Sequence, residues 1–302
     1  MSVRVPWQTG VLWQRLKDRT AHGMATGALQ PVETTFEHIE DAGIRFVVRV
    51  LANLTRKEKA RAQQGKTNPK NPFLPYEQDL YVTDISETHV CLLNKFKVVD
   101  NHFLIVTRAF ESQENWLGLA DFEAMVRCLG DVDGLGFFNG GTVAGASQPH
   151  KHLQVVPKVG EVSDFPMDRA IAATRKENGV DVSEILPFRH AIAKFDCTTN
   201  ISATEQLTQC AQNYLNSYRK LLTHVGINSD NWQGTQTAAY NLLCTRTWMM
   251  VVPRSQEKHA DISVNSLGFA GSLLVKTHSK LTELKEIGPM TLLEKVGCDR
   301  ER

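Results

Sequence analysis

Apolar and polar residues follow two different periods along the chain, and each period predicts a different element. A spacing near 3.6 residues predicts helices over 7–19, 121–130, 207–222 and 266–284, with Asp121 as the N-cap of the second. Short runs rich in β-branched and aromatic residues predict strands. These runs cover 32–39, 44–51, 80–83, 89–93, 103–107, 135–138, 151–156, 238–243 and 248–252.

The order of these elements predicts an α+β fold with a largely antiparallel sheet. The last two strands are expected to form a hairpin around 244–247. A mixed, polar stretch over 161–200 predicts a variable insertion or loop between an N-terminal part (1–160) and a C-terminal part (201–302). We expect the parts to form one compact unit.

Charge and cysteine content narrow the class of protein. The 302 residues hold 34 Lys plus Arg and 33 Asp plus Glu, a net charge of +1, so no general attraction to nucleic acid or to a membrane is expected. No apolar run approaches the about 20 residues that span a bilayer, and polar residues from Gln14 onward argue against a signal peptide. Six cysteines without Cys-x-x-Cys spacing predict reduced thiols and a cytoplasmic protein.

The segment 147–156 carries the strongest chemical signal. On a strand, alternate side chains face the same way, so His150, His152 and Gln154 are expected on one face, with Leu153 and Val155 facing a core. A neutral imidazole is a competent nucleophile at phosphorus near neutral pH. Taken alone, however, the two histidines could also be a metal-ligand pair or structural core residues, so a functional role and a structural role are about equally expected.

A glycine-rich loop precedes this strand, and it favours the interpretation of the loop and the two histidines as a phosphate site. Gly140, Gly141 and Gly145 allow backbone N–H groups to approach an anion, and Ser147 and Gln148 add side-chain donors. Zinc is weakly supported, because the sequence has no His-Glu-x-x-His and no paired cysteines. The loop and strand together predict a phosphate cradle beside a histidine nucleophile.

The motif His150-Lys-His-Leu-Gln154 resembles the His-x-His-x-Gln form of the histidine-triad (HIT) superfamily, which marks its nucleotidyltransferase branches. Further segments between about 45 and 280 are similar to the diadenosine tetraphosphate (Ap4A) phosphorylase, or ATP adenylyltransferase, family. These segments are 71–75, 93–96, 103–107, 138–141, 144–148, 248–255 and 265–276. The resemblance implies a HIT-like fold, with a mainly antiparallel sheet flanked by helices.

The resemblance also implies roles for individual residues. His152 would be the nucleophile that forms an adenylyl-histidine, and His150 and Gln154 would complete the catalytic motif. Lys57 is the best match to a substrate lysine, with Lys66 as the alternative. The other implied substrate-binding residues are Asn94, Lys95, Asn139, Gly145, Ala146, Ser147, Gln148, Gln154, Asn265, Ser266, Leu267, Ser272 and Lys276. Asn265-Ser266 equally fits a helix N-cap, and the basic run 56–70 fits a solvated loop better than a site.

The implied reaction cleaves Ap4A with inorganic phosphate to ADP and ATP, reversibly, and the resemblance also allows an ADP-sulfurylase reaction. Gln154 can hold a non-bridging oxygen but cannot act as a base toward water, so we expect it to favour phosphate as acceptor. We expect no covalent cofactor and no protein metal site, with Mg²⁺ accompanying the polyphosphate. The alternatives are a nucleotide-sugar uridylyltransferase of the same superfamily and a non-catalytic nucleotide-binding module.

Overall fold

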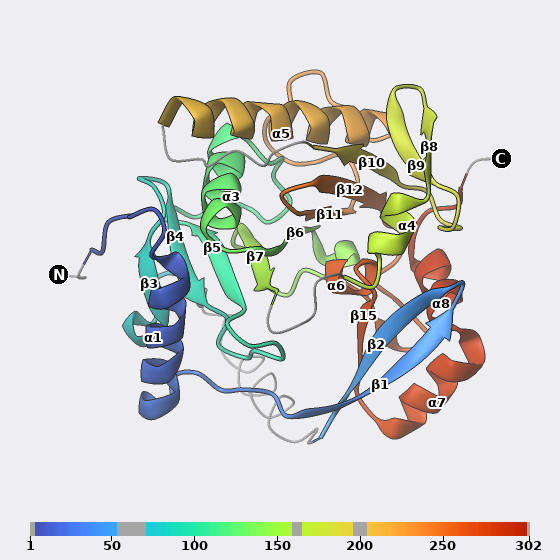
Figure 1. Cartoon of the computed structure of the whole chain (residues 1–302), viewed down its shortest axis with the longest axis horizontal. Coiled ribbons are helices and arrows are strands. Elements are labelled where there is room, and N and C mark those ends of the chain that lie inside the picture. The colour runs from blue at the N-terminus through green and yellow to red at the C-terminus, as the bar shows by residue number, and fades with distance from the viewer. Residues whose placement is uncertain (1–3, 53–70, 159–164, 196–203, 301–302) are drawn as a thin grey trace.

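A ten-stranded sheet forms the centre of the computed structural model, which describes residues 4–52, 71–158, 165–195 and 204–300 (Figure 1). Its strand order is β3-β4-β5-β7-β6-β11-β12-β10-β9-β8, and every neighbouring pair is antiparallel. The strands are β3 (Tyr81–Asp84), β4 (His89–Leu93), β5 (Phe103–Thr107), β6 (Gly134–Gly140), β7 (His152–Pro157), β8 (Thr174–Glu177), β9 (Val180–Ser183), β10 (Ala191–Lys194), β11 (Tyr240–Cys244) and β12 (Trp248–Pro253). The predicted α+β class and the β11–β12 hairpin are confirmed.

Helices cover one face of this sheet. The amphipathic helices α1 (Leu12–Thr26), α3 (Leu119–Asp131) and α5 (Thr204–His224) pack there, as Figure 1 shows for α3 and α5. Their apolar side chains share one core with Leu153 and Val155 of β7, which confirms the predicted direction of these two residues. Within the described ranges, every helix is too short or too polar to cross a membrane.

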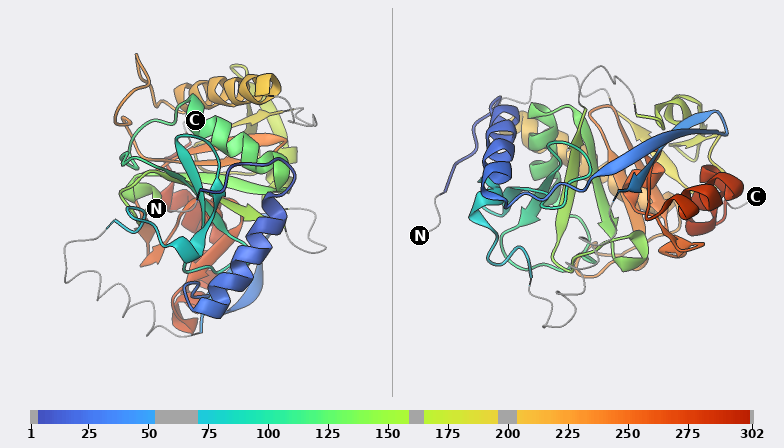
Figure 2. Two further views of the ribbon diagram at one scale, coloured as in Figure 1. Left: turned by 90° about the vertical axis from the view of Figure 1, so that its left-hand side faces the viewer. Right: turned by 90° about the horizontal axis from the view of Figure 1, so that it is seen from below.

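A second layer covers part of the other face. The strands β1 (Thr34–Asp41) and β2 (Ile44–Leu51) form a hairpin, and β15 (Ser272–Val275) pairs in parallel with β2 although more than 200 residues separate them. Figure 2 shows this hairpin beside the C-terminal helices. The remaining elements are η1 (Gln78–Leu80), η2 (Thr142–Ala144), α4 (Asp168–Ala172), β13 (Lys258–His259), β14 (Ile262–Ser263), α6 (Ser266–Phe269), α7 (His278–Ile287) and α8 (Pro289–Val296).

The prediction of one helix over 266–284 was wrong. The segment forms α6, then β15, then α7. Gly271 has a φ of +89°, a left-handed conformation that ends α6, and Thr277 starts α7 by accepting a hydrogen bond from the Lys280 N–H at 3.2 Å. The four residues of β15 adopt a strand because β2 offers them a partner, which the local periodicity does not show.

Three further predictions need correction. The first helix occupies Leu12–Thr26 rather than 7–19. Asp121 lies at the third position of α3, where its carboxylate accepts from the Gly118 N–H at 2.7 Å, so it is not the N-cap residue. The segment 161–200 is not simply a loop, because its described part contains α4, β8, β9 and β10, and strands of only four residues carry little periodic signal. The basic run 56–70, with Lys57 and Lys66, lies outside the described residues.

Candidate active site

A pocket of about 790 Å³ lies where β4, β5, β6 and β7 face the α6–β15 segment; we call it the site pocket. It brings together residues that are far apart in the sequence, from Arg49 to Lys280. Of the residues predicted from the sequence, those that line it are Asn94, Lys95, Asn139, Gly145, Ser147, Gln148, His152, Gln154, Asn265, Leu267, Ser272 and Lys276. His150, Ala146 and Ser266 lie behind this lining, and Lys57 is outside the described residues.

His152 begins β7 and presents one ring nitrogen to the site pocket. Its Nδ1–H donates to the backbone carbonyl of His150 at 2.9 Å, which leaves the lone pair on Nε2. Burial lowers the pKa of His152 to about 4, with the nearby His150 acting in the same direction and the hydrogen bond against it. The imidazole is therefore neutral near pH 7, which is the nucleophilic form.

His150 supports His152 from behind instead of reaching the ligand space. The imidazole is fully buried; Asn71 Nδ2 donates to its Nδ1 at 2.9 Å, and its Nε2–H donates to the Thr107 carbonyl at 2.8 Å. Burial lowers the pKa of His150 as well, against the hydrogen bond to Thr107. These contacts fix the His150 carbonyl that orients His152, so the first motif histidine positions the second.

A hydrogen-bonded relay orients the amide of Gln154. Asn94 Nδ2 donates to His102 Nδ1 at 3.1 Å, and His102 Nε2–H then donates to Gln154 Oε1 at 3.0 Å. Burial lowers the pKa of His102 to about 4, so the ring stays neutral and keeps an acceptor for Asn94. With Oε1 occupied, the NH₂ group of Gln154 is the part that a phosphoryl oxygen can reach.

Asn139 is oriented by a second buried network, which comes from the C-terminal half. Its Oδ1 accepts from Asn241 Nδ2 at 2.9 Å, from Ser266 N–H at 3.0 Å and from Ser266 Oγ at 2.7 Å. The buried guanidinium of Arg254 donates to Asn241 Oδ1 at 2.7 Å. Ser266 therefore does not line the site pocket but orients a residue that does.

The glycine loop packs directly against the C-terminal half. Gly145 has a φ of +87°, and a Cβ on it would lie 2.8 Å from the Val264 carbonyl, so glycine is required for this contact. The neighbouring Asn265 is the N-cap of α6, because its Oδ1 accepts from the Leu267 N–H at 3.0 Å. The helix-cap interpretation is thus confirmed, and the same residue also lines the site pocket.

Cations surround the rim of the site pocket. Lys95 forms an ion pair with Glu77 at 2.5 Å, Lys276 is exposed, and Lys280 pairs with Glu283 at 2.7 Å. Arg49 enters from β2 and is half-buried; burial lowers its pKa, opposed by Asp100. Its Nε has no hydrogen-bond partner among the described residues. These side chains suit the charge of a polyphosphate.

The sequence reasoning missed His102, Arg49 and Asn241, whereas it left Arg254 as either a structural or a phosphate-facing residue; the structure shows Arg254 buried and bonded to Asn241 and to backbone carbonyls. Two of the missed residues leave a local signal, because Arg49 interrupts an apolar strand and His102 opens one. Asn241 leaves none, since a polar residue near a strand end is usually on the surface. Among the described residues, no three His, Cys, Asp or Glu side chains gather as a metal site.

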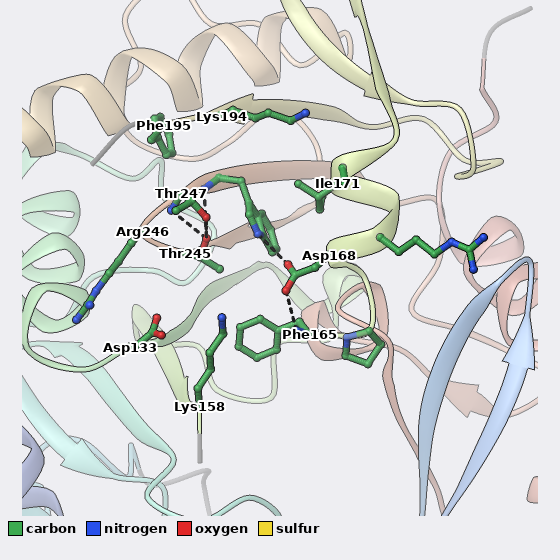
Figure 3. Close-up of a pocket in the computed structure, with 14 residues that line it drawn as sticks. Asp133, Lys158, Phe165, Asp168, Ile171, Lys194, Phe195, Thr245, Arg246 and Thr247 are labelled. Carbon is green, nitrogen blue, oxygen red and sulfur yellow. Dashed lines mark hydrogen bonds between the residues drawn. The ribbon is translucent and has the colours of Figure 1, made fainter. Parts of the chain in front are cut away.

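A second hollow, of about 920 Å³, lies beside the loop between β11 and β12; we call it the edge hollow (Figure 3). Four of its charged side chains, those of Asp168, Arg169, Lys194 and Arg246, form hydrogen bonds within the protein. Arg246 donates to the Leu129 and Gly130 carbonyls at 2.6 and 3.0 Å, and Lys194 donates to Thr174 Oγ1 at 2.7 Å. No residue that the sequence predicted as functional lines this hollow.

Comparison with known proteins agrees with this geometry. The model for the Ap4A phosphorylase N-terminal domain matches residues 2–173, and that for the ATP adenylyltransferase C-terminal domain matches 184–299. The chain is 26% identical over 304 residues to diadenosine 5',5'''-P1,P4-tetraphosphate phosphorylase 2 of Saccharomyces cerevisiae, covering 91% of this chain and 90% of the relative. It is 25% identical to the protein APA1 of the same yeast, covering 92% of each.

Solved structures show the same fold. The crystal structure of yeast Ap4A phosphorylase Apa2 matches with a TM-score of 0.76 and 25% identity, over 96% of this chain and 95% of that one. Its complex with Ap4A matches with a TM-score of 0.73 and 23% identity, over 96% and 98%. Since the N-terminal family model alone matches more than half of the residues, the chain belongs to the Ap4A phosphorylase (ATP adenylyltransferase) family.

Proposed function

We propose that this chain cleaves Ap4A with inorganic phosphate to give ADP and ATP. The observation that carries the proposal is the environment of His152. A neutral imidazole, held through Nδ1 by the His150 carbonyl, presents Nε2 to a pocket that Asn139, Ser147, Gln148 and Gln154 line with hydrogen-bonding groups. Family membership and the Ap4A complex of the yeast enzyme support the same reaction.

The first step transfers an adenylyl group to the protein. His152 Nε2 attacks the α-phosphorus, the bond from that phosphorus to the bridging oxygen breaks, and ATP leaves with the bonding electron pair. The leaving polyphosphate is a weak base, so positioning and charge stabilisation suffice without a strong general acid. The amide of Gln154, oriented by His102, donates to a non-bridging oxygen on which charge develops.

The second step returns the adenylyl group to phosphate. An oxygen of inorganic phosphate attacks the adenylyl-histidine, the P–N bond breaks, ADP leaves and the neutral imidazole returns. Because Gln154 has no basic atom, it does not activate water, and phosphate, already anionic, is the favoured acceptor. ADP-sulfurylase activity would use the same intermediate with a different leaving group.

Mg²⁺ enters this proposal as a companion of the polyphosphate. The carboxylates of the site pocket are Glu77 and Asp261, and these pair with Lys95 and Lys258 respectively. This lining does not fit a dedicated metal cage, so no step is assigned to a protein-held ion. A cytoplasmic location stays a prediction from the sequence.

Product analysis tests the proposal. Wild type and His152→Ala are incubated with Ap4A, with and without inorganic phosphate, and the nucleotides are separated. We expect ADP plus ATP only with phosphate, and no product from the variant. AMP plus ATP without phosphate would make the protein a hydrolase, and no turnover would direct the test to nucleotide sugars and then to binding alone.

A further inference from the structure

The strands β6 and β7 stop pairing at the point where the site pocket begins. Their antiparallel register runs from Gly134↔Pro157 to Phe137↔Gln154. Both strands continue beyond the last pair, Phe137↔Gln154: β6 extends to Gly140 beside β11, and β7 starts at His152 beside β5. Continued by two residues, the register would pair Asn139 with His152, but no such pair exists.

The side chain of Gln113 takes the place of the missing pair. Its Nε2 donates to the Asn139 carbonyl at 2.9 Å and to the His152 carbonyl at 3.2 Å, while its Oε1 accepts from the His152 N–H at 2.8 Å. These are three of the four main-chain groups that a direct Asn139–His152 pair would use. A side-chain amide carries the same donor and acceptor as a peptide group, so it satisfies both strands while keeping them apart.

The backbone around Gln113 holds this amide in place. The Gln113 N–H donates to the Pro149 carbonyl at 2.8 Å, the Lys151 N–H donates to the Glu111 carbonyl at 2.8 Å, and Ser112 forms an isolated bridge with His150. Gln113 is 2% exposed and does not line the site pocket, so a ligand there does not contact it. Gln113 can therefore affect the reaction only by positioning Asn139 and His152, to which its amide is bonded.

We propose that Gln113 is a positioning residue that separates β6 from β7 and thereby sets the spacing between the nucleophile His152 and the oxyanion ligand Asn139. Direct strand pairing would bring the two backbones to about 4.8 Å. The inserted amide widens this gap, and the α-phosphate must fit between the side chains of the two residues. The inference rests on the proposed function, because it takes His152 as the nucleophile.

Three variants test the proposal. Gln113→Leu removes all three hydrogen bonds; Gln113→Glu keeps the size and the acceptor for the His152 N–H but places oxygen against two carbonyls. Gln236→Leu is the matched control, because the Gln236 amide donates at 2.7 Å to the next carbonyl of β6, that of Gly140, and does not contact β7. For each, kcat and KM for Ap4A, the Kd for AMP and the melting temperature are measured.

We expect kcat to fall about 10²-fold in both Gln113 variants, as a displacement of about 1 Å at a reacting centre does. The Kd for AMP and KM should change far less than kcat, and Gln236→Leu should keep kcat within about threefold of the wild type. An unchanged kcat in folded Gln113 variants would overturn the proposal. So would a loss shared equally by kcat, AMP binding and the Gln236 control, or a failure of both variants to fold, since each indicates a purely structural role.

One readout does not depend on turnover. In the wild type, the side-chain amide protons of Gln113 and the backbone amide proton of His152 should exchange slowly in NMR spectra, and Gln113→Leu should lose the His152 protection. Fast exchange in the wild type would overturn the proposal even if the enzyme is active. Protection without Ap4A turnover would instead contradict the proposed function and leave the strand separation supported.

Discussion

The site pocket and the edge hollow differ in what their polar groups contact, not in size. Their volumes are similar, about 920 Å³ for the edge hollow and about 790 Å³ for the site pocket. In the edge hollow, the carboxylate of Asp168 accepts from Trp248 Nε1 at 3.1 Å and from the Phe165 N–H at 2.7 Å, and Arg246 is bonded to backbone carbonyls. In the site pocket, hydrogen bonds from behind leave His152 Nε2 and the Gln154 amide facing the open space. In a ligand-binding site, hydrogen bonds within the protein orient each polar side chain from one side and leave its other polar atom for the ligand.

Two histidines show the same difference at the level of single residues. His152 and His190 are both buried, and each donates Nδ1–H to the carbonyl two residues earlier, at 2.9 and 2.8 Å. Burial lowers the pKa of each to about 4. His190 Nε2, however, accepts from the Ser183 N–H at 2.8 Å, whereas His152 Nε2 lines the site pocket. Burial and a lowered pKa do not by themselves make a nucleophile.

The largest expected effect separates these two histidines. Replacing each by Gln keeps a polar atom near the Nε2 position but removes the imidazole nucleophile. We expect His152→Gln to lower kcat for Ap4A phosphorolysis by about 10⁴-fold or more. His190→Gln should keep kcat within about threefold, because its Nε2 is used inside the fold. Steady-state kinetics with product separation measures both, and comparable losses would contradict the assignment of His152.

The next effect concerns the amide that faces the ligand. Gln154→Leu should lower kcat about 10²-fold, the usual cost of one lost oxyanion donor. His102→Leu should lower it less, because His102 acts only by orienting Gln154. The double variant should then be no slower than Gln154→Leu alone. Additive losses in this double-mutant cycle would show that His102 has a separate role.

A smaller effect comes from the pH dependence of stability. Burial lowers the pKa values of three histidines to about 4, whereas a histidine in the unfolded chain has a pKa of about 6.5. The three are His102, His152 and His190. Between pH 6.5 and 4 the unfolded chain therefore binds more protons at these histidines than the folded chain does. Because of this, the free energy of unfolding falls as the pH drops through this range. Between pH 7 and 5 we expect a loss of about 2 kcal/mol per buried imidazole. Urea denaturation at both pH values measures it; equal stability would contradict neutral burial.

The smallest effect belongs to the edge hollow. Arg246→Ala removes two hydrogen bonds to carbonyls at the end of α3 and should lower the free energy of unfolding by about 1 kcal/mol. Its kcat/KM for Ap4A should stay within about twofold of the wild type. Lys194→Ala should leave kcat/KM equally unchanged. A tenfold loss of activity in a fully folded variant would show that the edge hollow takes part in catalysis.

The motif residues were predictable because their chemistry is local in the sequence. The alternation in 150–156 sends His152 and Gln154 to one face of β7 and Leu153 to the other, and the structure has the same pattern. The family resemblance added Asn94, Asn265 and Lys276, which indeed line the site pocket. The roles of Lys57 and Lys66 stay predictions, because both lie outside the described residues.

The residues that hold the site in place were not predictable in the same way. Gln113 lies in a segment without a recognisable motif, and its side chain bonds to the backbone of His152 on β7, 39 residues further along the chain. Likewise, β15 is a strand only because β2 pairs with it. The helix predicted over 266–284 failed because the partner that makes β15 a strand, β2, lies more than 200 residues away in the sequence.

The sequence by itself determined the fold class and the alternation of β7, and it predicted a nucleophile and a phosphate loop, because each of these depends on neighbouring residues and on backbone geometry. The tertiary structure decided which nitrogen of His152 is available, which way the Gln154 amide points and how far β6 stands from β7. These depend on hydrogen bonds between segments that meet only in the folded chain. The residue types of the site can be read from local sequence, whereas the orientation of their side chains depends on contacts between distant segments.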